Sequence, residues 1–212
     1  MELEETRLLP KKLLADLAKR GDLHTFAKGE ILITEGAASD ALFVLISGQL
    51  KVFTRETNGL EIIFNMLQPG EMFGEMFLDG GTRSASVKAT ADSKCVVIDD
   101  KQIKQLIRTV PDFSESLIQS LIARLRRATL MIKSLVMNDV YERTTALLNQ
   151  VALTEGKTRV VPTDMTQQEI ANRVGATREM INHVISGLIK GGFMSRDEKR
   201  RLVFTKSLPT RW

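Results

Sequence analysis

Cysteine is nearly absent from this sequence: the chain of 212 residues has one, Cys95. Disulfide frameworks, cysteine zinc sites and cysteine-ligated iron–sulfur clusters within one chain are therefore excluded. Cys95 begins the apolar run CVVI, so we interpret it as a small buried hydrophobic residue. The two histidines, His24 and His183, are far apart in the sequence, and neither belongs to a nucleophile–base pair or a metal-ligand cluster. We expect neither an enzyme nor a metal site.

Aromatic residues and long apolar runs are also scarce. Phe, Trp and Tyr make up 5% of the chain, which argues against extensive base stacking on single-stranded nucleic acid. The chain begins with the acidic and polar stretch MELEETRLLPKK, and no apolar run approaches the ~20 residues that span a bilayer. We therefore expect a cytoplasmic protein without a membrane partner.

Positive charge is concentrated near the C-terminal end. Between Met165 and Trp212 there are nine Lys or Arg residues against four acids, an excess of five, whereas the whole chain carries a net charge of +4. The first 164 residues are thus close to neutral. A neutral body with a basic final unit predicts a polyanionic partner for that unit.

The first half of the chain has the pattern of a β-rich domain. After a predicted helix at 10–20, with Pro10 at its first position, short apolar runs alternate with glycines from about residue 25 to residue 100. This alternation of apolar runs and glycines predicts an antiparallel roll, barrel or sandwich. Asn58-Gly59 predicts a hairpin turn.

From residue 100 to 137 the apolar period becomes helical, with Pro111 as the expected start of a long helix. Apolar residues at 3-4-3-4-3 spacing form a coiled-coil seam of nearly three heptads: Ile118, Leu121, Leu125, Ala128, Ile132 and Leu135. The seam predicts a homodimer. The alternative is a helix that packs only on its own roll.

A capping box at Asp139 and Glu142 predicts that a new helix starts after a break at Met137–Asp139. We take this break as a domain boundary and a hinge. The predicted organisation is α+β: a roll with its N-terminal helix at 1–110, a dimerisation helix at 111–137, and a C-terminal unit at 138–212 that contains a turn and short strand at 155–163.

The stretch MTQQEIANRVGATREMINHVISGLIKGG predicts a helix-turn-helix. Thr166 and Glu169 predict a capping box, Gly175 a turn, and Thr177 the cap of a second helix. The expected inner face of that helix is Met180, Ile181, Val184, Ile185 and Leu188, and the outer face is Arg178, Glu179, Asn182, His183 and Ser186.

This outer face suits the major groove of double-stranded DNA. Arg178 can bond guanine, Glu179 can accept from cytosine, and Asn182 can read adenine or hold a phosphate. The following stretch, SRDEKRRLVF, predicts a basic wing in which Lys199, Arg200 and Arg201 contact phosphates. The candidate DNA-binding set is Thr166, Gln167, Thr177, Arg178, Glu179, Asn182, His183, Lys199 and Arg200. The alternative is an ordinary helical hairpin with a solvated face.

The order of these parts resembles the CRP–FNR family of bacterial transcription regulators over residues 23 to 205. The residues that carry the resemblance are FGEMFLDGGTRSASVKA (73–89), DVYER (139–143) and TQQEIANRVGATREMINHVISGL (166–188). The resemblance implies an N-terminal β-roll of the cyclic-nucleotide-binding type, a dimerisation helix and a winged helix-turn-helix. It also implies a near-palindromic operator and RNA polymerase as a partner.

The resemblance further implies an effector site in the roll, formed by Gly74, Glu75, Met76, Arg83, Ser84 and Thr129. Glu75 would accept from a ribose hydroxyl, while Arg83 and Ser84 would hold a cyclic phosphate. The family contacts the base through adjacent hydroxyl residues on the dimer helix; here the positions are Ala128 and Thr129, and Ala128 has no hydroxyl. The alternative for the roll is an internal Glu75–Arg83 pair with no ligand.

Three functions remain open at this point. The first is a homodimeric DNA-binding regulator controlled by cAMP or another cyclic nucleotide. The second is a regulator of the same fold with a different effector or with none. The third is a cyclic-nucleotide-binding regulatory subunit of an enzyme, against which the helix-turn-helix and wing argue.

Overall fold

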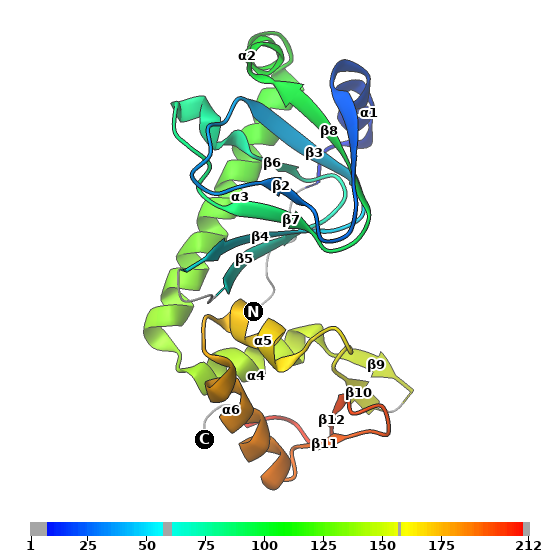
Figure 1. The fold of residues 1–212 in the computed structure, drawn as a ribbon, viewed down its shortest axis with the longest axis vertical. Coiled ribbons are helices and arrows are strands. Elements are labelled where there is room, and N and C mark those ends of the chain that lie inside the picture. Colours follow the sequence, from blue (N-terminus) through cyan, green and yellow to red (C-terminus); the bar gives the residue numbers. More distant parts are fainter. Residues whose placement is uncertain (1–7, 57–60, 157, 210–212) are drawn as a thin grey trace. The chain divides into compact units, whose positions relative to one another are not determined.

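The computed structural model describes residues 8–56, 61–156 and 158–209 (Figure 1). The chain separates into two compact units, with the main division inside a long helix, between Thr129 and Leu130. Among the described residues, no helix combines the length and the apolar character needed to cross a membrane.

The strands between Asp22 and Asp99 form a roll of two four-stranded sheets. One sheet has the order β1 (Asp22–Phe26), β8 (Ser93–Asp99), β3 (Ala41–Ser47), β6 (Met72–Phe73), and the other β2 (Ile31–Ile33), β7 (Ser86–Ala89), β4 (Leu50–Arg55), β5 (Glu61–Leu67). The registered pairs of both sheets are antiparallel, as the glycine-punctuated pattern predicted. The predicted turn at Asn58-Gly59 lies outside the described residues.

Strand β3 has a continuous apolar sequence because both of its faces are buried. Phe43 and Leu45 point into the core between the sheets, while Leu42 and Val44 pack on the helices that cover the opposite face. Since both faces are buried, the run carries no polar alternation. Sequence reasoning did not identify β1, whose residues are mostly exposed, or β6, which has two residues.

The covering helices are α1 (Lys11–Arg20), α2 (Asp100–Thr109) and the start of α3 (Pro111–Met137). Pro10 is the residue before α1, rather than the first helical residue as predicted. The helical region 100–137 is two helices because Val110 is extended, with φ −125° and ψ 90°. A residue before proline disfavours the helical conformation, so the chain breaks there and α3 begins at Pro111.

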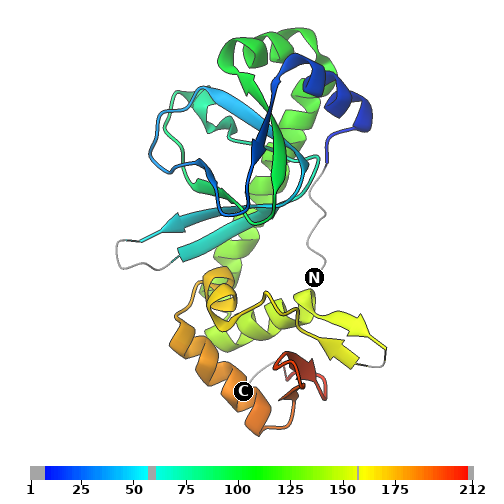
Figure 2. The ribbon, with the colours of Figure 1, turned by 45° about the vertical axis from the view of Figure 1, so that its right-hand side comes forward.

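In the second unit, the described residues that follow α3 form helices and a small sheet. The elements are α4 (Val140–Val151), β9 (Leu153–Glu155), β10 (Thr158–Val160), α5 (Gln167–Val174), α6 (Arg178–Lys190), β11 (Met194–Arg196) and β12 (Leu202–Phe204). The helices pack on one another (Figures 1 and 2), around a core that includes Leu148, Ile170 and Ile181. The sheet has the order β11-β12-β10-β9.

The predicted capping box at the start of α4 is confirmed. The Asp139 carboxylate accepts from the Glu142 backbone N–H at 2.8 Å, and the Glu142 carboxylate accepts from the Asp139 N–H at 3.3 Å. The secondary structure therefore breaks where the sequence places the hinge. That this break separates the domains and acts as a hinge stays a prediction.

Candidate effector and DNA-binding sites

Two left-handed glycines shape the candidate effector loop. Gly74, with φ 83°, ends β6 and precedes the 3₁₀ helix η1 (Glu75–Asp79), which Gly80 closes with φ 81°. A β-carbon on Gly74 would lie 2.6 Å from the Arg83 Nη1 atom. Glycine is favoured here, because the backbone approaches the Arg83 guanidinium closely and takes a φ that other residues disfavour.

Arg83 is buried and donates its hydrogen bonds to the backbone. Its Nη1 donates to the Gly74 carbonyl at 2.6 Å, its Nη2 donates to the Ala41 carbonyl at 3.0 Å, and its guanidinium carbon lies 5.6 Å from the centre of the Phe43 ring. Burial lowers the pKa of Arg83, and the charges of Asp40 and Glu75 oppose this effect. A buried cation at a glycine turn is a suitable group for binding a phosphate.

Glu75 pairs with Arg124 of α3, not with Arg83. Both oxygens of the buried Glu75 carboxylate lie 2.6 Å from Arg124 Nη1, and Arg124 Nη2 donates to the Met72 carbonyl. The alternative of an internal Glu75–Arg83 pair is therefore wrong. Arg124 was not among the effector-site residues expected from the sequence. The signal available was its spacing: Arg124 lies one helical turn before Ala128, which was already assigned to the ligand side.

A second arginine of α3 lies near this loop. Arg127 donates to the Asn65 side-chain oxygen at 3.1 Å, and burial lowers its pKa, an effect that the charge of Glu71 opposes. The pKa of the buried Glu71 is raised by burial, although its carboxylate accepts from the Gln68 N–H at 3.0 Å. Arg124 and Arg127 thus bring two cations of α3 to two carboxylates of the roll.

The remaining predicted effector residues are exposed. They are Met76, Ser84 and Thr129; Thr129 donates its hydroxyl to the Leu125 carbonyl at 2.9 Å, within its own helix. The structure therefore brings together Gly74, Glu75 and Arg83, adds Arg124, and leaves three predicted groups at the surface.

The predicted seam of α3 is exposed along its length. The exposed fractions are 56% for Ile118, 41% for Leu121, 68% for Leu125, 62% for Ile132 and 50% for Leu135, and Ala128 is also exposed. Large apolar side chains at such regular spacing form the kind of stripe that a second helix covers.

The helix-turn-helix is formed by α5 and α6. The Thr166 hydroxyl accepts from the Glu169 N–H at 3.1 Å, Gly175 ends α5 with φ 67°, and the Thr177 hydroxyl accepts from the Met180 N–H at 3.3 Å. Two predictions need correction. The Glu169 carboxylate bonds Arg173 at 2.8 Å instead of completing a capping box, and Met180 is 46% exposed instead of facing inward.

The outer face of α6 carries the predicted polar residues. Arg178, Glu179, Asn182 and His183 are exposed, whereas Ser186 is half-buried. Gln167, at the start of α5, donates its side-chain amide to the Asn182 oxygen at 3.2 Å. This bond links the two helices at their polar ends, so the Asn182 oxygen already has a protein partner.

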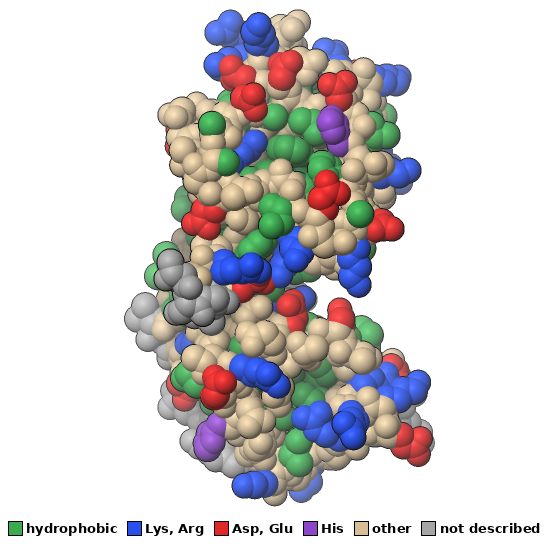
Figure 3. Space-filling view, in the orientation of Figure 1, with side chains coloured by type: hydrophobic (Ala, Val, Ile, Leu, Met, Phe, Trp, Pro, Cys, Tyr) green, Lys and Arg blue, Asp and Glu red, His purple; other side chains and the backbone are tan. Residues whose placement is uncertain are grey.

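The wing is the hairpin of β11 and β12. Lys199 and Arg200 are exposed, and they line a hollow of about 250 Å³ together with Thr166, Gln167 and Arg196. Figure 3 shows basic side chains over the small sheet of the second unit, with acidic ones beside them. Arg201 was expected to contact phosphate, but its guanidinium pairs with Glu155 and Asp197. Arg201 therefore has two carboxylate partners within the protein, and its own contact with phosphate stays an untested prediction.

Comparisons with known proteins find matches over most of the chain. The model of the cyclic nucleotide-binding domain matches residues 23–110, and that of the Crp-like helix-turn-helix domain matches residues 142–207. The chain is 32% identical over 195 residues to a CRP-like cAMP-activated global transcriptional regulator of Mycobacterium tuberculosis, covering 90% of this chain and 87% of the relative. It is 30% identical over 168 residues to the cyclic AMP receptor protein of Thermus thermophilus, covering 79% and 76%.

Solved structures share the fold. The structure of a c-di-GMP responsive global regulator of Xanthomonas campestris has a TM-score of 0.79 and 22% identity, covering 92% of this chain and 98% of that chain. A CRP/FNR-family transcriptional regulator of Thermus thermophilus has a TM-score of 0.72 and 21% identity, covering 90% and 95%.

Proposed function

Because the chain belongs to the CRP–FNR family of transcription regulators, and not to a family of enzymes, we propose that it is a homodimeric, sequence-specific DNA-binding regulator controlled by a cyclic nucleotide in the roll. Two proteins that it resembles at 30% identity or more are named for cyclic AMP. Cyclic AMP is therefore the first effector to test. Chromosomal DNA as the target places this function in the cytoplasm, and RNA polymerase is the partner that the family implies.

The observation that carries this proposal is the charge arrangement around Gly74. Arg83 supplies a buried cation for the cyclic phosphate, and Glu75 supplies a buried acceptor for the ribose hydroxyl. Arg124 joins this carboxylate to α3, the helix whose apolar seam is exposed. A ligand that competes for Glu75 would therefore act on the helix through which we propose the chain dimerises.

The DNA side of the proposal rests on α6 and the wing. Arg178, Glu179, Asn182 and His183 would read base edges, while Thr166, Gln167, Thr177, Lys199 and Arg200 would contact phosphates. In a symmetric dimer the two copies of α6 would enter major grooves about 34 Å apart, on a near-palindromic site.

One observation favours a second candidate, a regulator that needs no effector. Arg83 and Glu75 have hydrogen-bond partners within the protein, and Ala128 offers no hydroxyl to a base. A ligand that binds Arg83 and Glu75 must replace these internal hydrogen bonds, so it gains less binding free energy from them.

Calorimetric titration with cyclic AMP, and with cyclic GMP for comparison, distinguishes the two. The proposal expects saturable binding near one ligand per chain, lost in Arg83→Ala, with the fold of the variant verified by circular dichroism. DNA affinity measured with and without nucleotide then tests the coupling. Absence of binding to both nucleotides, with DNA affinity intact, would favour the effector-independent regulator.

A further inference from the structure

The turn of the wing has an unusual backbone. Residues 197–201 connect β11 to β12, and among the described residues Arg200 is the only non-glycine with a positive φ, 61°. A side chain disfavours this left-handed conformation, so it persists only where surrounding contacts enforce it. Within the turn, Arg200 N–H donates to the Asp197 carbonyl at 2.9 Å, and Arg196 Nη1 donates to the Arg200 carbonyl at 3.0 Å.

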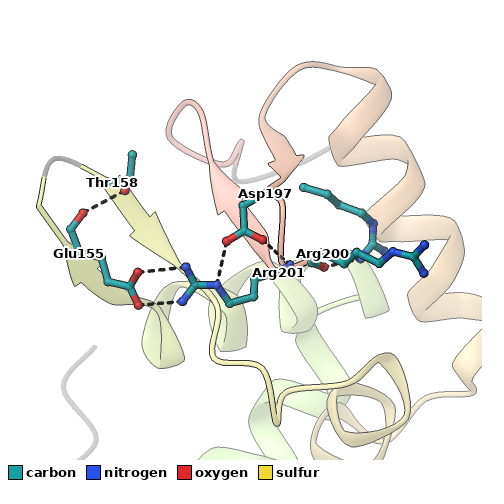
Figure 4. A network of polar contacts seen from close by, with 6 residues as sticks. Glu155, Thr158, Asp197, Arg200 and Arg201 are labelled. Atoms are coloured by element: carbon teal, nitrogen blue, oxygen red, sulfur yellow. Dashed lines mark hydrogen bonds and ion pairs between the residues drawn. The ribbon is translucent and has the colours of Figure 1, made fainter.

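Arg201 fixes this turn to a different hairpin (Figure 4). Its Nη1 and Nη2 atoms donate to the two carboxylate oxygens of Glu155, in β9, at 2.8 and 3.0 Å. Its Nε donates to Asp197 Oδ2 at 2.8 Å, and its backbone N–H donates to Asp197 Oδ1, also at 2.8 Å. All three guanidinium nitrogens therefore bond protein carboxylates, and the Arg201 side chain is only 18% exposed.

The charges agree with this geometry. Hydrogen bonding to Glu155 and Asp197 raises the pKa of Arg201, and hydrogen bonding to Arg201 lowers the pKa of Glu155. With its charge compensated by two carboxylates, Arg201 contributes little to the attraction of a polyanion. The cations left on the turn, Lys199 and Arg200, are exposed beside the start of α5.

We propose that Arg201 is a positioning residue for DNA binding: by joining Glu155 to Asp197, it holds the wing turn so that Lys199 and Arg200 are presented to DNA phosphates. This inference rests on the proposed function, in which the wing contacts DNA. It adds the β9–β10 hairpin to the DNA-binding machinery through a carboxylate that does not itself touch DNA. Pre-positioned cations bind more tightly because less freedom is lost on binding.

The proposal and simple electrostatics predict opposite effects of Glu155→Gln on DNA affinity. Glu155→Gln removes a negative charge close to the wing, which by itself would strengthen binding to DNA. If Glu155 acts through Arg201, the same change releases the turn and weakens binding. Glu198→Gln is the matched control: it makes the same charge change on the turn itself, at an exposed residue outside the Arg201 network.

The experiment measures the binding of the full chain to a duplex of about 30 base pairs, with and without cyclic AMP, as a function of salt. We expect Glu155→Gln to weaken binding about threefold to tenfold, and Glu198→Gln to leave it unchanged or strengthen it. Arg201→Lys keeps the charge but loses the paired hydrogen bonds of the guanidinium to Glu155, so it should weaken DNA binding as much as Glu155→Gln does. Combining it with Glu155→Gln should add nothing further, because both changes break the same link.

Two outcomes separate this inference from the proposed function. Lys199→Gln removes one phosphate contact and should reduce the slope of log K against log salt by about 0.9. An unchanged slope would refute the contact of the wing with DNA. If Lys199→Gln reduces the slope but Glu155→Gln binds DNA with the same affinity as Glu198→Gln, only the positioning role of Arg201 is overturned. Circular dichroism of Glu155→Gln, whose side chain is 49% exposed, verifies that the fold is retained.

Discussion

Arg124→Gln should destabilise the first unit strongly, because it leaves a buried carboxylate without its counter-charge. Removing one partner of a buried ion pair costs about 3–5 kcal/mol. The Glu75 side chain is 8% exposed and that of Arg124 is 27% exposed, so water reaches part of the pair. Allowing for this screening, we expect a loss of about 2–3 kcal/mol. Each kcal/mol lowers the melting temperature by about 4–8 °C in a domain of 60–100 residues and by about 2–4 °C in one of 150–250. The first unit lies between these sizes.

The assay is thermal unfolding followed by circular dichroism, at one fixed protein concentration because dissociation of a dimer shifts the apparent stability. Arg20→Gln is the matched control. The Arg20–Asp16 pair has a similar distance, 3.0 Å, but its side chains are 46% and 43% exposed. Its loss should cost only about 0.3–0.5 kcal/mol.

A double-mutant cycle isolates the pair itself. In Glu75→Gln combined with Arg124→Gln, no carboxylate remains to be left unpaired, so the double variant should be less destabilised than the sum of the single variants. The reasoning is refuted if Arg124→Gln has the same melting temperature as Arg20→Gln, or if the cycle gives no coupling energy between Glu75 and Arg124. Either result would mean that the Glu75 carboxylate is well solvated without Arg124.

Three further predictions concern the seam, the glycine loop and the cysteine. Leu125→Lys places a charge at the most exposed of the large seam residues, and light scattering should show a shift from dimer to monomer at micromolar concentration; a persistent dimer would place the interface elsewhere. Gly74→Ala should lower the free energy of unfolding in urea more than Gly80→Ala does. Both glycines have φ near 80°, which costs an alanine about 1–2 kcal/mol, but only the β-carbon at Gly74 would contact other atoms. Equal losses would contradict the contact with Arg83. Burial raises the pKa of Cys95 to about 12, so at pH 8 the thiol of the folded protein should not react with Ellman's reagent, whereas rapid reaction without denaturant would show that the roll opens.

The sequence alone predicted the parts of this protein that depend on nearby residues. The caps at Asp139, Thr166 and Thr177 and the turn at Gly175 involve groups only a few positions apart, so their spacing in the sequence is their spacing in the helix. The seam of α3 is similar, since its 3-4 spacing defines one helix face whatever the rest of the chain does. An antiparallel β-architecture followed from short apolar runs between glycines, which left a roll, a barrel and a sandwich open.

Two predictions, for Glu169 and Met180, were wrong for local reasons that the sequence does not rank. Glu169 had two partners within reach, the backbone before α5 and Arg173 four residues later, and the structure selects Arg173. Met180 is apolar, yet it lies at the edge of the face defined by Ile181, Ile185 and Leu188, and it is exposed. Hydrophobicity by itself does not state how wide the buried face of a helix is.

Only the tertiary structure decided which charged residues meet. Glu75 and Arg124 are 49 positions apart, and Glu155 and Arg201 are 46 positions apart. The sequence does not show which of these side chains pair, because an ion pair of this kind depends on how separate elements pack and not on spacing along the chain. Arg83, Glu75 and the wing cations were identified from the sequence, whereas the partners that bind or position them became visible only once the chain was folded.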